Sequence, residues 1–263
     1  MPAKKNFLLP PKIHPAIMAV WAAAIAGAHC LPTIPLTGIG SSFSVANTLF
    51  PLSGILFGPV AGALCSAAGA FIGNILAPHT AWMGLITFII GTTTSFTAGC
   101  IAWGSWPMIT IDRRGNFIFN GGIIIYLMGT LLWFSQEIGR SFIYLPIICY
   151  GAGFAALIAG CLFSGKILTG KNEFLKFPVM WFGAFGGMFG GATVGNFFTL
   201  IKTHLPKETW ILLVPQSILE RAIFSAGTVL IGVPLLMGLR KIGIFAGPQA
   251  EEESSLPPPP EKI

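Results

Sequence analysis

Long apolar stretches recur along this sequence, separated by short clusters of glycine, proline and charged residues. A helix of about 20 apolar residues crosses about 30 Å of hydrocarbon, and most of the stretches approach this length. The pattern predicts an all-α polytopic membrane protein with a single transmembrane domain over residues 15–242. About eight spans are expected, at residues 15–31, 44–58, 60–76, 82–104, 118–135, 143–164, 177–200 and 210–238.

The second and third predicted spans form one unbroken apolar run that contains the dipeptide Gly58-Pro59. As a single helix the run would extend about 50 Å at 1.5 Å per residue, which overshoots the membrane. Proline lacks a backbone N–H and its ring clashes with the preceding turn, so Pro59 does not continue a helix. We therefore expect two shorter helices that fold back on each other at this dipeptide.

The amino-acid composition limits which surroundings and which partners we expect for this chain. Hydrophobic residues make up 54% of the chain and charged residues 9%, which is too little polar surface for a protein dissolved in water. Membrane lipids are the expected surroundings. The net charge is +6, yet no basic stripe alternates with aromatic residues, so no nucleic-acid partner is expected.

The positions of the basic residues predict how the chain is oriented. With eight spans and both termini in the cytoplasm, most basic residues lie inside, and only Arg140, Lys202 and Lys207 lie outside, as the positive-inside rule requires. Residues 1–14 then form a cytoplasmic N-terminal segment. Residues 243–263 are acidic and proline-rich, so they are predicted to be a disordered cytoplasmic tail.

The stretch FGAFGGMFGGATVGN carries glycines at every fourth position, namely Gly183, Gly187, Gly191 and Gly195. A phosphate-binding loop needs a strand before it, a helix after it and usually a lysine with a serine or threonine, whereas the flanks LKFPVMW and NFFTLI are largely apolar, so this context excludes a nucleotide site here. On a helix, this spacing makes a smooth ridge that another helix can approach closely. The ridge either holds a fixed neighbour or lets a moving partner slide along it.

A second small-residue ridge occurs in the first predicted span, where Ala19, Ala23 and Gly27 recur at the same spacing. Small residues allow close helix contacts in a membrane, where lipid removes the hydrophobic driving force. Both internal packing and contact with a partner protein are open for this ridge.

Polar residues near the outer ends of the spans are the candidates for a binding site, because ligand sites in membrane proteins are built where polar groups gather. They lie in the first outer loop, in the turn after the third span, and in the last two spans. Ordinary loop, anchoring or capping roles are the alternatives for each of them. The candidates are Thr37, Ser41, Asn47, Asn74, His79, Trp82, Asn196, Gln216 and Glu220.

Glu220 is the candidate with the greatest physical cost, because it lies near the middle of the last predicted span. An isolated carboxylate there costs about 2.5 kcal/mol or more, so it must be paired, protonated or hydrated. Gln216 lies four residues earlier and shares its helix face. Arg221 is adjacent, but neighbouring helical residues point about 100° apart, so simple pairing is not expected. One of the two residues therefore needs another partner, which would be a ligand, a lipid headgroup or another subunit.

Catalytic and metal-binding patterns are missing from the sequence. The nine acidic residues are dispersed, and the five cysteines lie in apolar runs without C-x-x-C spacing. We therefore expect no enzyme activity, no cofactor and no metal. An integral-membrane enzyme of lipid or isoprenoid metabolism is kept as an alternative, as is a stand-alone secondary transporter.

Three stretches together resemble the S components of energy-coupling factor (ECF) transporters, which are the substrate-binding membrane subunits of these vitamin and micronutrient importers. They are the Ala19-x-x-x-Ala23 pattern, the run FPLSGILFGPVAGALCSAAGAFIGNIL, and the last span SILERAIFSAGTVLIGVPLLMGLRKIG with its basic end. The resemblance covers residues 13–104 and 177–242, and it rests on the order and spacing of these stretches.

The resemblance implies a protein of a prokaryotic cell membrane that binds a small organic nutrient from the outer side. The family's partners are a coupling membrane subunit and a pair of cytosolic ATPases. In the family, the first outer loop is a lid over the pocket, and the Ala19-x-x-x-Ala23 pattern lies against the coupling subunit. An ATP site is not expected in this chain.

The chain also departs from the family pattern. Family members usually have six spans, whereas residues 118–164 add an inserted transmembrane hairpin whose role the sequence does not indicate. An inserted pair keeps both termini on the same side of the membrane. The metal-transporting relatives carry an N-terminal histidine motif that this chain lacks, so cobalt and nickel are not expected as substrates.

Overall fold

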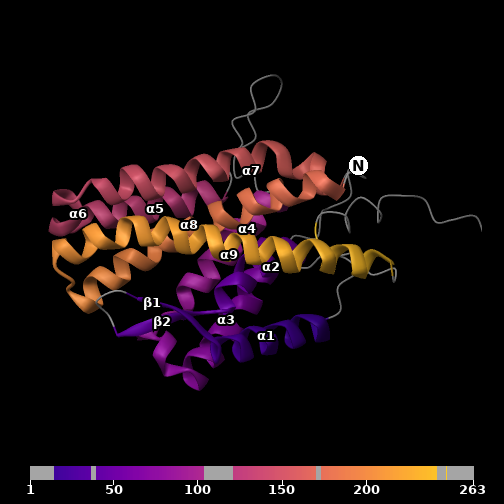
Figure 1. The fold of residues 1–263 in the computed structure, drawn as a ribbon, viewed down its shortest axis with the longest axis horizontal. Coiled ribbons are helices and arrows are strands. Elements are labelled where there is room, and N and C mark those ends of the chain that lie inside the picture. Colours follow the sequence, from indigo (N-terminus) through magenta and orange to yellow (C-terminus); the bar gives the residue numbers. More distant parts are fainter. Residues whose placement is uncertain (1–14, 37–39, 104–120, 170–172, 242–246, 248–263) are drawn as a thin grey trace, which may run out of the picture.

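The computed structural model describes residues 15–36, 40–103, 121–169, 173–241 and 247, and these residues form a bundle of helices with a small β-hairpin (Figure 1). The predicted N-terminal segment lies outside the described residues, as does all of the predicted tail except Gly247. The longer helices are α1 (Pro15–His29), α2 (Ala46–Phe57), α3 (Pro59–Leu76), α4 (Phe88–Trp103), α5 (Gly121–Ser135), α7 (Gly151–Thr169), α8 (Glu173–Thr203) and α9 (Lys207–Lys241).

Short elements connect these helices. They are the strands β1 (Pro32–Leu36), β2 (Ser41–Ser44) and β3 (Trp82–Leu85), the helix α6 (Glu137–Ser141), a 3-10 turn η1 (Pro78–Thr80) and a π-helical segment η2 (Leu145–Tyr150) that leads directly into α7.

Each of the eight predicted spans corresponds to one of the longer helices. Among the described residues, five segments are long and apolar enough to cross a membrane, namely Pro59–Leu76, Gly84–Trp103, Leu145–Phe163, Phe174–Thr203 and Lys207–Leu239. The helices α1, α2 and α5 are also apolar but shorter, with 15, 12 and 15 residues. The chain is therefore an integral membrane protein of the all-α class.

The predicted break between the second and third spans is confirmed at Gly58. This residue has φ +85° and ψ 172°, and Pro59 begins α3 at its first helical position, where a missing N–H has no cost. The two helices then pack tightly, because a Cβ placed on Gly62 would lie 2.5 Å from the carbonyl oxygen of Ser53. Every residue of α2 except Asn47 is buried, so α2 is enclosed by its neighbours.

The glycine ridge of α8 packs against α4 inside the bundle. Going along α8, its four glycines face Ile101, Ala98, Thr94 and Ile90 of α4 in order. A Cβ on Gly187 would lie 2.7 Å from the Cβ of Ala98, a separation that real side chains do not adopt. The absence of side chains on α8 therefore brings the two helices into direct contact.

The small-residue ridge of α1 faces the opposite way, toward the outside of the bundle. Ala19, Ala23 and Gly27 are all exposed, and nothing lies within 4 Å of a Cβ placed on Gly27. The inner face of the same helix carries Ile25, which is buried against Gly69 of α3. Among the described residues, the ridge has no helix packed on it.

The first outer loop, for which no strands were predicted, contains a β-hairpin. Its strands β1 and β2 pair in antiparallel fashion, with Pro32 opposite Ser44, Pro35 opposite Ser42 and Leu36 opposite Ser41. Gly40 has φ +68° just before β2, a conformation that glycine adopts without strain. Thr37 lies outside the described residues.

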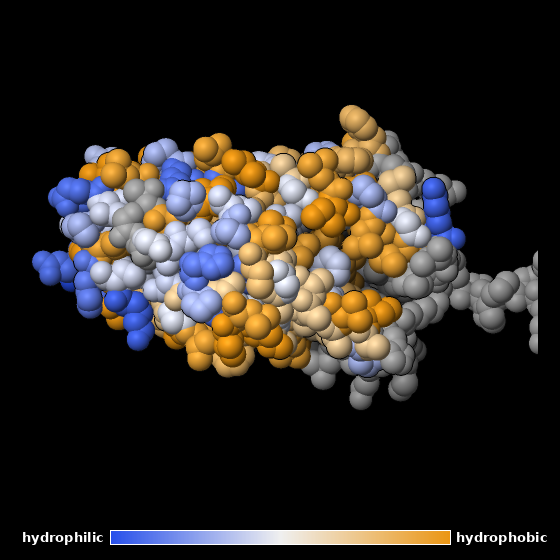
Figure 2. All heavy atoms as spheres, turned by 60° about the horizontal axis from the view of Figure 1, so that its bottom comes forward, coloured by the Kyte–Doolittle hydropathy of each residue, from blue (hydrophilic) through white to orange (hydrophobic). Residues whose placement is uncertain are grey.

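The helices place two groups of chain segments at opposite ends of the bundle (Figure 1). We call the end with β1–β2, α6 and the α8–α9 connection the hairpin end, and the end with Pro15 the opposite end. The amide of Gly247 donates a hydrogen bond of 2.9 Å to the carbonyl of Leu56, so Gly247 lies beside the end of α2. Hydrophilic side chains gather at the hairpin end, while apolar ones dominate the body of the molecule (Figure 2).

Candidate functional site

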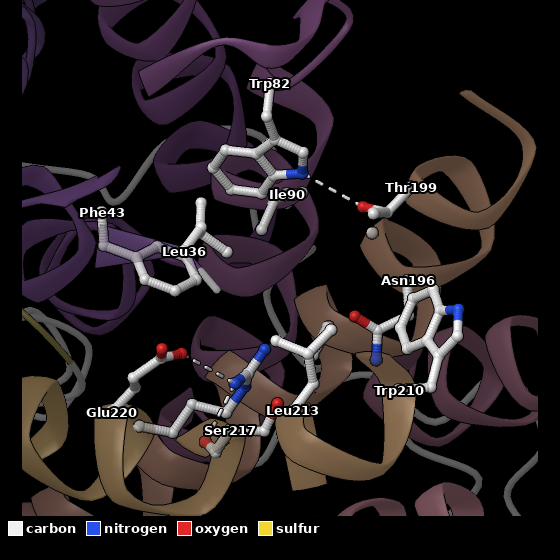
Figure 3. A pocket seen from close by; sticks show the side chains of 13 residues that line it. Leu36, Phe43, Trp82, Ile90, Asn196, Thr199, Trp210, Leu213, Ser217 and Glu220 are labelled. Carbon is white, nitrogen blue, oxygen red and sulfur yellow. Dashed lines mark hydrogen bonds and ion pairs between the residues drawn. The ribbon is translucent and has the colours of Figure 1, made fainter. Parts of the chain in front are cut away.

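Three small cavities adjoin each other beneath the β-hairpin. The first has a volume of about 50 Å³ and lies between the hairpin, α4, α8 and α9 (Figure 3). The second, of about 30 Å³, continues toward α2, and the third, of about 20 Å³, lies beside α1 and α3. The polar side chains that line the first cavity are Trp82, Asn196, Thr199, Trp210, Ser217, Glu220 and Arg221.

Aromatic contacts from the hairpin close this site. Phe43 of β2 lines both the first and the second cavity. Its ring meets Trp82 edge-on at 5.5 Å between centroids and Phe224 at 6.0 Å. Cavities of about 20–50 Å³ hold one or a few water molecules and not an organic molecule. As they stand they are closed to a larger ligand, which would need lining side chains such as Phe43 to move.

Glu220 and Arg221 of α9 form an ion pair at the boundary of the first two cavities. Arg221 Nη1 lies 3.6 Å from Glu220 Oε2, so the two neighbours form an ion pair. The long arginine side chain folds back along the helix, donates a 2.9 Å hydrogen bond to the Ser217 carbonyl, and lies 4.9 Å from the centre of the Phe189 ring. Because the arginine side chain folds back in this way, its guanidinium reaches the Glu220 carboxylate although adjacent helical residues point about 100° apart.

The ion pair is buried but incompletely satisfied. Glu220 is 4% exposed, and its Oε1 has no hydrogen-bond partner among the described residues. The 3.6 Å separation exceeds the 2.7–2.9 Å of a charge-assisted hydrogen bond. A buried acceptor of this kind costs about 1–3 kcal/mol when it is left unpaired. The carboxylate therefore has hydrogen-bonding capacity left for a water or a ligand.

Side chains of η2 and α5, in the segment predicted to be an inserted hairpin, support two residues that line the first cavity. The Asn196 amide donates a 3.1 Å hydrogen bond to the hydroxyl oxygen of Tyr150 in η2. Trp210 stacks edge-on against Trp133 of α5, with 4.9 Å between ring centroids. Trp133 and Tyr150 are almost fully buried. Neither was a predicted site residue, because nothing in their apolar local sequence distinguishes them from ordinary core aromatics.

Polar contacts hold the β-hairpin against the helices. The side-chain amide of Gln216 donates a 2.8 Å hydrogen bond to the Pro35 carbonyl, which ties β1 to α9. Asn47 donates a 3.1 Å hydrogen bond to the Ser44 carbonyl at the start of α2. Trp82 donates a 3.1 Å hydrogen bond to the Thr199 hydroxyl on α8, as Figure 3 shows. The first two contacts join the β-hairpin to α9 and α2, and the third joins β3 to α8.

The third cavity is also polar. His29 Nδ1 lies 3.0 Å from the Thr80 hydroxyl, which in turn lies 3.5 Å from Asn74 Oδ1. His29 Nε2, Ser44 Oγ and Asn74 Nδ2 are buried and have no hydrogen-bond partner among the described residues. A cavity of this size accommodates one water that would satisfy part of this group.

The structure brings together some of the predicted site residues and separates others. Asn47, Trp82, Asn196 and Glu220 line the cavities, whereas Gln216 fastens the roof. The remaining candidates lie elsewhere: Asn74 behind the third cavity, Ser41 on the hairpin, and the exposed His79 in η1. The aromatic and polar lining residues that were not predicted are Phe43, Thr199, Trp210 and Ser217, together with Arg221, which was considered only as a neighbour of Glu220.

Metal ligands do not cluster in the part of the chain that the structure describes. No group of three or more histidine, cysteine, aspartate or glutamate side chains there is placed to hold an ion. All five cysteines are free thiols, and Cys30 is the exposed one among them.

Comparison with known proteins yields one distant relative. The chain is 26% identical over 203 residues to the uncharacterized protein MJ0923 of Methanocaldococcus jannaschii. The match covers 74% of this chain and 62% of that protein, so the chain spans less than two thirds of the relative's length. No family model matches the sequence. No solved structure matches it.

Proposed function

We propose that this chain is the substrate-binding membrane subunit of an ECF-type ABC importer. It captures a vitamin or related small organic nutrient from the outer side and delivers it by reorienting in the membrane. The observation that carries the proposal is the closed polar site beneath the β-hairpin, which contains the buried pair of Glu220 and Arg221. Ionisable groups inside a membrane are costly, so their presence favours a site that uses them.

The outward ridge of α1 supports a docking role. Ala19 and Ala23 are exposed side by side on one face, which gives a partner helix room to approach the α1 backbone closely. In this proposal the partner is a coupling membrane subunit that is driven by a pair of cytosolic ATPases. The chain itself then needs no cofactor, no metal and no enzymatic activity, because the ATPases supply the energy.

The charge distribution supports an outward-facing site. Arg140, Lys202 and Lys207 belong to elements at the hairpin end, whereas four basic residues lie near the opposite ends of α7, α8 and α9, namely Lys166, Lys176, Arg240 and Lys241. With the opposite end in the cytoplasm of a prokaryotic cell, the excess of basic residues lies inside and both termini are cytoplasmic. The site then opens to the exterior.

The helix arrangement supports a six-helix core with an added pair. In this interpretation the core consists of α1, α2, α3, α4, α8 and α9. The inserted hairpin consists of α5 and α7, which brings the number of spans to eight. The short α2 is compatible with this count because its neighbours bury it, so its length need not match the lipid.

Co-purification tests the proposal. A tagged full-length chain is isolated in mild detergent from membranes of its native host, and stoichiometric partners are identified by mass spectrometry. We expect one polytopic coupling protein and two ATP-hydrolysing subunits. A chain that has no such partners and accumulates solute by itself in proteoliposomes would instead be a secondary transporter, and the proposal would be wrong.

A further inference from the structure

The charged side chains that line the first two cavities indicate which class of ligand the site suits. Glu220 and Arg221 line both cavities, and they are the only formally charged side chains among the described residues that do so. Their charges cancel across a separation of 3.6 Å. An anionic or cationic ligand would leave one charge in excess at a buried location, which is unfavourable. A ligand without net charge keeps the balance.

The unused hydrogen-bonding groups specify what the ligand presents. Glu220 Oε1 is a buried acceptor without a partner among the described residues, and Trp210 Nε1 is a buried donor without one. A guanidinium carries five N–H donors, and the Arg221 side chain has one hydrogen bond to Ser217 beside its ion pair. The pair therefore offers an acceptor and donors next to each other, which matches a ligand edge that carries one donor and one acceptor.

The shape of the site favours a flat ligand. Phe43 lies between Trp82 and Glu220 in Figure 3, and it lines both cavities. If the β-hairpin moves away and takes the Phe43 ring with it, the space that the ring leaves joins the two cavities into one slot. The edges of that slot are the rings of Trp82 and Phe224, which are the groups that Phe43 contacts in the closed form. Aromatic walls of this kind pack well against a planar ring.

We propose that the site takes a neutral planar ring whose edge carries an N–H beside a carbonyl, as in a cyclic amide or cyclic urea. The ligand N–H donates to Glu220 Oε1, and the ligand carbonyl accepts from the Arg221 guanidinium. The ring replaces Phe43 between Trp82 and Phe224. This assignment deepens the proposed function and rests on it, since it names the substrate class of the same site.

Binding of small probes to the purified full-length chain in lipid nanodiscs tests the assignment. The probes are 2-pyridone, which carries the N–H and carbonyl edge, pyridine, which lacks it, benzoate as an anion, benzamidinium as a cation and phenylalanine as a zwitterion. Trp82 and Trp210 line the first cavity, so quenching of tryptophan fluorescence reports occupancy, and calorimetry gives the affinity. We expect 2-pyridone to bind about tenfold or more tightly than each other probe, as for a hydrogen bond to a charged group.

Two variants separate charge recognition from a merely structural role. Glu220→Gln leaves Arg221 unbalanced and should shift the preference toward benzoate, whereas Arg221→Met leaves Glu220 unbalanced and should shift it toward benzamidinium. Phe43→Ala opens the slot without touching the pair, and it should strengthen 2-pyridone binding. An unchanged order of preference in both charge variants would overturn the assignment. So would tighter binding of a charged or zwitterionic probe, or the absence of 2-pyridone binding to Phe43→Ala.

Failure of this assignment is distinguishable from failure of the importer proposal, because the binding measurement uses the chain without partners. If the chain prefers benzoate yet co-purifies with a coupling subunit and two ATPases, only the substrate class is wrong. If 2-pyridone binds as expected but no such partners are found, the importer proposal is wrong and the ligand class stands.

Discussion

At the residue scale, glycines and a buried carboxylate have opposite roles in the membrane-embedded part of this protein. Glycines on α8 remove volume so that α4 can approach, and the buried carboxylate of Glu220 on α9 adds polarity inside the bundle. The first kind lowers the cost of close helix contact, whereas the second creates an unmet hydrogen bond. Packing and binding are therefore assigned to different residues of neighbouring helices.

Gly187→Leu should destabilise the fold. A Cβ at this position would lie 2.7 Å from the Cβ and 3.1 Å from the backbone nitrogen of Ala98, so α4 must shift to accommodate it. Overpacking of this kind costs about 1–3 kcal/mol. The measurement is the Tm of the detergent-solubilised protein. Gly27→Leu is the matched control, because nothing lies within 4 Å of its Cβ, and equal losses of Tm in both variants would contradict this account.

The sequence identifies some site residues and not others for a physical reason. Asn196 and Glu220 stand out because a polar group within an apolar stretch has a cost that demands an explanation. Phe43 and Trp210 do not stand out, because aromatic residues are common throughout this chain. Their role depends on where β2 folds over α9, and that long-range contact leaves no local pattern.

At the element scale, the segment predicted to be an inserted hairpin supports the site from behind. Tyr150 of η2 holds the amide of Asn196, and Trp133 of α5 supports the ring of Trp210. Both supported residues line the first cavity. The sequence alone gave this insertion no role, whereas its contacts make it a second layer behind the binding surface.

Tyr150→Phe should weaken ligand binding without unfolding the protein. The substitution removes the hydroxyl that accepts the Asn196 hydrogen bond, so the amide loses its fixed orientation. A neutral hydrogen bond is worth about 0.5–1.5 kcal/mol, which corresponds to a loss of affinity of about two- to tenfold. Calorimetry with 2-pyridone measures it. Tyr144→Phe is the control, since Tyr144 is 63% exposed, and an equal effect of the two variants would refute the positioning role.

The helices and strands were predictable where the chemistry of a single residue determines the backbone conformation. They were not predictable where contacts between distant segments determine it. Pro59 cannot continue a helix, so the break after α2 follows from the residue itself. The strands β1 and β2 were missed because the segment is short and rich in proline, glycine and serine, which is typical of a loop. Its pairing is stabilised by contacts to distant helices, such as the hydrogen bond from Gln216 to Pro35.

At the scale of the whole molecule, the site and the proposed docking ridge are separate surfaces. The site lies among α4, α8 and α9 beneath the hairpin, whereas Ala19 and Ala23 lie on the outer face of α1. The two surfaces are linked through the short connection from α1 to β1, which contains Cys30. Binding and docking can therefore be disrupted independently.

Cys30 provides a native reporter of orientation. It is exposed at the hairpin end, whereas Cys65, Cys100 and Cys149 are buried. The proposed topology predicts that a membrane-impermeant maleimide labels Cys30 in intact cells. Cys30→Ser should abolish this labelling. If Cys30 reacts only in inside-out vesicles, the proposed orientation of the site is wrong.

The most direct test of the account combines docking and binding in one measurement. Ala19→Trp and Ala23→Trp place a large ring on the outward ridge, and Leu162→Trp, at a position 71% exposed on α7, is the matched control. For each variant, 2-pyridone affinity and the recovery of the coupling subunit and ATPases are measured from the same preparation. Both ridge variants should keep their 2-pyridone affinity and lose the partners, while the control should keep both. Ridge variants that retain the partners, or that lose binding and fold together, would contradict this expectation.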